Sequence, residues 1–131
     1  MASRRQYRAL ESWLVIAIAV HSLAIGAILL FFTRWGTTLG GFSDVSPLFF
    51  ARQGGIFHVV VAAGYLLDFF RYRSVAFLLL AKILAVVFLT GIMVVEPHAS
   101  WTVPLSAVGD GGMALAIYLV HRRSANPGLS G

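Results

Sequence analysis

The chain has 131 residues, of which 59% are apolar and only 11% are charged, and it contains no cysteine. A soluble domain of this length could not bury so much apolar surface, so an ordinary soluble enzyme is excluded. The absence of cysteine also excludes disulfides, thiolate metal sites and a catalytic thiol. A membrane span needs about 20 residues, and a mean hydropathy of +0.85 indicates that four spans take up nearly the whole chain. Any function must therefore lie in the bundle, on its short loops or in a partner.

A glycine-rich loop separates the first two predicted spans. The first span covers residues 13–32 and follows a basic, polar head. Its apolar run exceeds the roughly 7 to 15 residues of a signal peptide, so we expect it to be retained in the membrane. Residues 36–47, which are rich in glycine and include Asp44, predict a loop. The second span then covers residues 50–70.

The second pair of predicted spans follows a basic turn that contains Arg71 and Arg73. The third span covers residues 74–95 and is apolar except for Lys82, and Glu96 follows its end. The fourth span covers residues 101–120, contains Asp110 beside three glycines, and is the least apolar. The sequence therefore predicts an all-α fold, namely a single integral membrane four-helix bundle.

The distribution of basic residues predicts the orientation of this bundle. Seven arginines flank the span ends on one side and only two flank the other, and the seven are Arg4, Arg5, Arg8, Arg71, Arg73, Arg122 and Arg123. Because Lys and Arg flanks are retained in the cytoplasm, both termini are predicted to be cytoplasmic. The net charge of +5 is then explained by topology and by contact with anionic lipid. No nucleic-acid partner is expected, since no basic cluster lies along a soluble face.

Lys82 and Asp110 are the clearest charged residues inside the predicted spans. Lys82 lies ~12 Å from the cytoplasmic start of its span and Asp110 lies ~13 Å from the outer start of its own, so the two reach a similar level near the midplane. One interpretation is an ion pair that joins two neighbouring spans. The other is a functional site, with Asp110 as a proton carrier or Lys82 as a ligand for a carbonyl, phenolate or carboxylate group.

A second polar group is predicted along one side of the second span. Helical spacing places Arg52, Gly55, His58 and Tyr65 on related faces, so this polar and small side should face inward. Arg52 also reaches the outer level of Glu96 at the end of the third span, which predicts a second ion pair.

His21, near the middle of the first span, raises the alternative of a b-type haem held together with His58. The two depths disagree, so haem b is disfavoured and a hydrogen-bonded interhelical histidine is the preferred interpretation. No metal site is predicted, because no His or carboxylate pair has ligand spacing inside a helix. No catalytic motif is present either, so no catalytic residues are predicted and an activity of its own is not expected.

The segment ARQGGIFHVVVAAGYLLDF, followed by Lys82 and then Asp110 in the next two spans, resembles the DoxX-like small four-helix bacterial membrane proteins. The resemblance extends over most of the chain. It implies a multi-pass protein of the bacterial inner membrane, in some cases an accessory subunit of a quinone-linked oxidoreductase that handles sulfur compounds or oxidative stress. It also implies inward-facing roles for Arg52, Gly55, His58, Tyr65, Lys82 and Asp110. Without cysteine, thiol chemistry would have to come from a partner.

Three functions are compatible with these features. The preferred one is an accessory or anchor subunit of a membrane complex, with partner subunits and with quinone as the candidate ligand of a buried polar site between spans two, three and four. The second is an autonomous small carrier or hydrophobic-ligand-binding protein, for which a homodimer would compensate for the lack of an internal repeat. The third is an enzyme that acts on a lipid-like substrate, which ranks last because no set of acid, base and nucleophile is evident.

Overall fold

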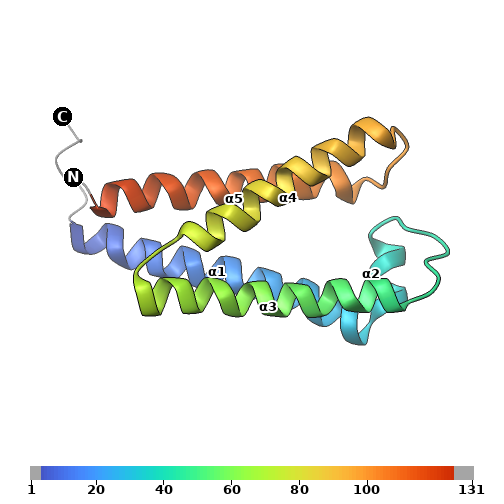
Figure 1. The fold of residues 1–131 in the computed structure, drawn as a ribbon, viewed down its shortest axis with the longest axis horizontal. Coiled ribbons are helices and arrows are strands. Elements are labelled where there is room, and N and C mark those ends of the chain that lie inside the picture. The colour runs from blue at the N-terminus through green and yellow to red at the C-terminus, as the bar shows by residue number, and fades with distance from the viewer. Residues whose placement is uncertain (1–3, 126–131) are drawn as a thin grey trace.

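The computed structural model describes residues 4–125, which form five helices and no strand (Figure 1). These helices are α1 (Arg4–Phe31), α2 (Thr33–Leu39), α3 (Phe49–Tyr72), α4 (Ala76–Val95) and α5 (Thr102–Ala125). The four long helices, α1, α3, α4 and α5, are each long and apolar enough to cross a membrane. The predictions of an all-α fold and of a multi-pass membrane protein are therefore confirmed.

Two helical boundaries extend well beyond the predicted spans. Helix α1 begins at Arg4 instead of near residue 13, and α5 continues to Ala125 instead of ending near residue 120. Hydropathy marks only the part of a helix that lies in hydrocarbon, whereas the backbone hydrogen bonds of a helix continue through its polar flanks.

The predicted loop over residues 36–47 is only partly correct, because the short helix α2 occupies Thr33–Leu39. The hydroxyls of Thr33 and Thr37 each donate to a carbonyl one turn earlier, so these polar side chains are bonded within the helical segment. Gly41, with a φ of 82°, then turns the chain away from the helix.

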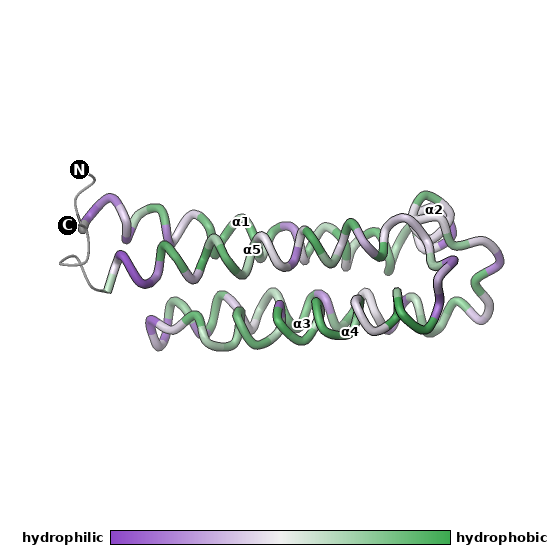
Figure 2. Tube along the Cα trace, turned by 90° about the horizontal axis from the view of Figure 1, so that it is seen from above, coloured by the Kyte–Doolittle hydropathy of each residue, from purple (hydrophilic) through white to green (hydrophobic). Residues whose placement is uncertain are grey.

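The long helices pack as two pairs, α1 with α3 and α4 with α5, and the pairs are joined mainly by α1 against α5. Helix α4 starts beside α3 at the turn between them and then crosses toward α5 (Figure 1). The start of α1 and the end of α5 lie at the same end of the bundle, where hydrophilic residues gather (Figure 2). We call this the terminal end, and the end that carries α2 the opposite end.

The buried core occupies the middle of the bundle and its terminal end. It contains Val15, Ile18 and Ala19 of α1, Ala62, Tyr65 and Phe69 of α3, Val75 and Leu78 at the start of α4, and Ile117 of α5. Most other large apolar side chains are exposed, as expected where a membrane helix faces lipid or a neighbouring protein.

Helices α1 and α3 approach each other most closely at two glycines. A Cβ atom added to Gly26 would lie 2.9 Å from the carbonyl oxygen of Gly55, and one added to Gly55 would lie 2.9 Å from the carbonyl oxygen of Gly26. Small residues allow such close backbone approach between membrane helices. This contact fixes how the two helices lie against each other.

Candidate functional site

An ion pair lies inside the bundle, between α4 and α5. Lys82 Nζ is 2.5 Å from Asp110 Oδ1, and the exposed fractions of the two side chains are only 7% and 17%. The predicted contact between these two residues is therefore present. It forms because α4 and α5 run antiparallel, so residues at equal depth face each other.

Side chains from the other two long helices lie within electrostatic range of this pair. The charges of Lys82 and Asp110 both act on His58 of α3, and the charge of Asp110 also acts on Tyr65, which is 2% exposed. Ser22 of α1 is equally buried and lies near Tyr65. We call these five residues the polar cluster; each of the four long helices contributes at least one of them.

Ser22 could not be singled out from the sequence, which drew attention to its neighbour His21. The structure buries Ser22 and leaves His21 exposed on α1. His21 is still close enough to interact electrostatically with His58. A serine in an apolar helix does not by itself indicate a buried polar site, because its hydroxyl can bond to the backbone of its own helix. Only the rotation of α1 about its axis shows that Ser22 faces the interior of the bundle.

Arg52 and Glu96 do not form the predicted second ion pair. Both residues are exposed, and Arg52 Nε donates to Thr33 Oγ1 at 3.3 Å instead. The prediction was wrong because equal depth does not make two helices neighbours: α4 has moved from α3 to α5 by the time it reaches Glu96. Gly55 faces inward as expected, and its place is at the contact with Gly26.

A second buried polar network lies at the terminal end and joins α1 to α5. Glu11 is 6% exposed, and its two carboxylate oxygens lie 2.5 Å from His121 Nδ1 and 2.9 Å from Ser124 Oγ. The sequence signal that could have revealed this network is the spacing of His121 and Ser124, which lie one turn apart on α5. Serine and histidine both bond to the carboxylate, so the imidazole does not activate the hydroxyl as it would in a nucleophile–base pair.

An apolar cavity of about 430 Å³ lies toward the opposite end, between α1, α2, α4 and α5. Its lining residues include Ile25, one turn from Ser22, and Ser106, one turn from Asp110. The cavity therefore lies about one helical turn, or ~5 Å, from the polar cluster.

The described residues offer groups for a hydrogen-bonded ligand more readily than for a metal. Among residues 4–125, no three His, Asp or Glu side chains come together as metal ligands. The polar cluster instead provides an ammonium, a phenol, an imidazole and a carboxylate, which can donate to a carbonyl oxygen or hold a proton.

Comparison of the chain with protein-family models, with curated proteins and with solved structures finds no match. The resemblance to DoxX-like proteins therefore stays a prediction. The geometry of the polar cluster and of the apolar cavity is the basis on which we infer a function.

Proposed function

We propose that the protein is an accessory or anchor subunit of a membrane complex, and that its polar cluster binds the polar head of a hydrophobic ligand such as a quinone. The observation that carries this proposal is the polar cluster, in which a buried ion pair of α4 and α5 lies near polar side chains of α1 and α3. Ionisable residues within a membrane are costly to insert, and they commonly mark substrate, ion or proton sites.

The residues of the polar cluster have the chemistry that such a ligand needs. Lys82 and Tyr65 would donate hydrogen bonds to a carbonyl oxygen, and Asp110 would balance the charge of Lys82 and hold a proton. The neighbouring apolar cavity of about 430 Å³ would receive part of the ligand's apolar body. A polar site next to an apolar cavity suits a molecule with one polar and one apolar end.

The exposed surfaces of α4 and α5 support an accessory role. Helix α4 buries only Leu78 and Lys82, and α5 exposes Gly109 and Gly112, where an added Cβ would meet no atom within 4 Å. Small residues on such a surface let another membrane helix pack closely. We therefore place the partner subunits against this pair of helices.

Native mass spectrometry of the tagged protein, gently extracted from its own membrane, tests both parts of the proposal. We expect other subunits to copurify and quinone to appear in a lipid extract of the same sample. Extraction of an active, stable monomer would contradict the accessory role. Absence of quinone from a sample that retains its subunits would contradict the ligand.

The second candidate function is an autonomous carrier or binding protein for a hydrophobic ligand. The apolar cavity beside the polar cluster favours it as well, since this function needs no partner. A homo-oligomer that carries a bound apolar molecule and no foreign subunit would support this alternative over the accessory role.

We further propose that both termini face the cytoplasm of a bacterial inner membrane. Arginines at the terminal end outnumber those at the opposite end, which supports this orientation. Because the chain has no cysteine, single cysteines at Ser43→Cys and Ala125→Cys can be labelled selectively. We expect an impermeant maleimide to label Ser43→Cys in intact cells and Ala125→Cys only after permeabilisation. The reverse pattern would contradict the orientation.

A further inference from the structure

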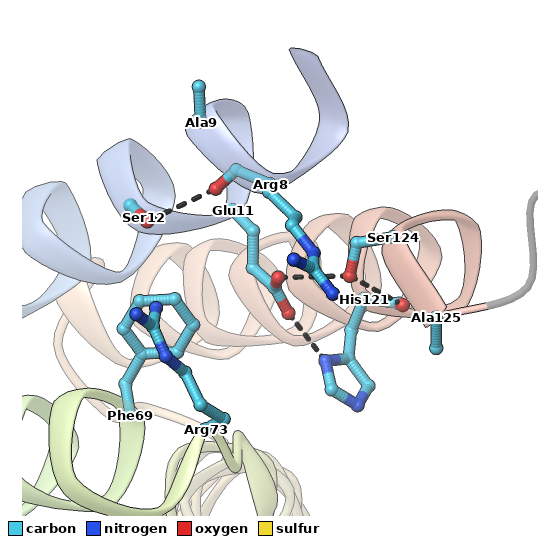
Figure 3. A pocket seen from close by; sticks show the side chains of 9 residues that line it. All are labelled: Arg8, Ala9, Glu11, Ser12, Phe69, Arg73, His121, Ser124 and Ala125. Atoms are coloured by element: carbon cyan, nitrogen blue, oxygen red, sulfur yellow. Dashed lines mark hydrogen bonds and ion pairs between the residues drawn. The ribbon is translucent and has the colours of Figure 1, made fainter. Parts of the chain in front are cut away.

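A cavity of about 680 Å³ lies at the terminal end, far along the bundle from α2. The start of α1, the end of α3 and the end of α5 surround it (Figure 3). Two arginines line it, Arg8 from α1 and Arg73 from the residue that follows α3. Among the described residues, the only carboxylate in its lining is that of Glu11.

The carboxylate of Glu11 is engaged by partners other than these arginines. Both of its oxygens are already bound, one by His121 and the other by Ser124 (Figure 3). Within residues 4–125, neither Arg8 nor Arg73 forms an ion pair. Among the described residues, neither guanidinium of the cavity is therefore paired with a carboxylate, and the two positive charges exceed the single negative charge of Glu11.

The guanidinium of Arg73 is held in place by an aromatic ring. It lies over the ring of Phe69, 5.8 Å from the ring centre, and Phe69 is itself buried in the core. A guanidinium held by its face keeps its N–H edge for an anion, and its planar fork matches two phosphate oxygens. This arrangement reduces the side-chain entropy that binding would cost.

The cavity lies at the level of lipid headgroups. Exposed aromatic side chains from three helices mark the membrane interface at this end, namely Trp13, Tyr72 and Tyr118, which are 71%, 70% and 44% exposed. Arg8 lies in the polar flank, about one and a half turns before Trp13, and Arg73 directly follows Tyr72.

We infer that this cavity binds the phosphate of an anionic phospholipid headgroup, with Arg8 and Arg73 as its ligands. Basic pockets between membrane helices are suited to such headgroups. The cavity volume of about 680 Å³ lies in the range of sites that bind small molecules. The cavity therefore fits a lipid headgroup better than a lone phosphate ion. The inference is independent of the function proposed for the polar cluster.

Titration of the full chain in neutral detergent micelles, followed by native mass spectrometry, tests this site. The probes are palmitoyl-oleoyl phosphatidylglycerol, the zwitterionic phosphatidylcholine with the same chains, and inorganic phosphate. We compare Arg8→Gln/Arg73→Gln with Arg71→Gln/Arg122→Gln. The control removes the same charge from exposed arginines at the same end, and Arg122 stacks on Tyr118 much as Arg73 stacks on Phe69.

We expect phosphatidylglycerol to bind more tightly than phosphatidylcholine. The Arg8→Gln/Arg73→Gln variant should lose about tenfold or more of this affinity, and the control should lose less than about threefold. Arg8→Lys/Arg73→Lys, which keeps the charge without the planar fork, should lie between the wild type and the Gln variant.

Three results would overturn the inference. Equal losses in the two double Gln variants would show only a general attraction to the arginine-rich end. Equal binding of the two lipids would exclude selection for the anionic headgroup. Binding of inorganic phosphate as tightly as phosphatidylglycerol, with the same dependence on Arg8 and Arg73, would identify a soluble anion as the occupant.

Discussion

Lys82→Met should lower the free energy of unfolding by about 3–5 kcal/mol, because it leaves Asp110 as an unpaired charge inside the bundle. The 2.5 Å contact between Nζ and Oδ1 is the only hydrogen bond that the described structure gives to either side chain. Unfolding by titration with sodium dodecyl sulfate, followed by circular dichroism, measures the change. A loss below about 1 kcal/mol would show that Asp110 finds another partner or reaches solvent.

The double variant Lys82→Met/Asp110→Leu separates structure from function. Replacing both charges by apolar side chains removes the unpaired group, so most of the stability lost in Lys82→Met should return. Quinone binding by this variant then decides the role of the ion pair. If the variant folds but no longer retains quinone, the polar cluster is the ligand site; if it retains quinone, the pair only joins α4 to α5.

A matched control for this pair is Arg52→Met. Arg52 is also a cation on a membrane helix, but it is exposed and, within the described part of the chain, its side chain bonds only to the hydroxyl of Thr33. We expect its loss to change stability by less than about 1 kcal/mol. A comparable loss in both variants would mean that removal of any cation destabilises this bundle.

Hydropathy and depth were sufficient to predict the spans and the contact between Lys82 and Asp110. Each apolar segment is just long enough to cross the membrane once. Residues at equal depth in two neighbouring helices therefore lie side by side. The same reasoning failed for Arg52 and Glu96, because depth gives the level of a residue but not which helix lies beside it. Here it depends on how far α4 has crossed away from α3 at the level of Glu96, for which the sequence pattern carries no direct signal.

Rotation about the helix axis was the other quantity that the sequence could not provide. His21 and Ser22 are adjacent, and only the packing of α1 on α3 and α5 decides that Ser22 is buried. Glu11 was overlooked for a different reason: it lies in the polar flank, where a charged residue usually faces water. Its burial results from the continuation of α1 and α5 beyond the apolar spans.

Gly26→Ala should destabilise the bundle by about 1–3 kcal/mol, because the added methyl group has no room between α1 and α3. Its Cβ would lie 2.9 Å from the carbonyl oxygen of Gly55 and 3.2 Å from Cβ of His58. A backbone carbonyl cannot rotate away as a side chain can, so the two helices must separate. The gain from replacing a helical glycine by alanine, at most about 1 kcal/mol, offsets only part of this cost.

Gly54→Ala is the matched control, since it makes the same substitution in α3 where the nearest atom to an added Cβ, Cδ1 of Leu29, would lie at an ordinary contact distance of 3.9 Å. It should leave stability unchanged or raise it slightly. The same detergent titration compares the two variants. Equal stabilities would contradict a rigid contact at Gly26.

Separation of α1 from α3 should also disturb the polar cluster, because Ser22 lies one turn from Gly26 and His58 lies one turn from Gly55. We therefore expect Gly26→Ala to weaken quinone retention even at temperatures where the protein stays folded. Gly54→Ala, which leaves α1 and α3 in contact, should retain quinone as the wild type does. Loss of quinone in Gly26→Ala alone would link the glycine contact to the ligand site through the positions of Ser22 and His58.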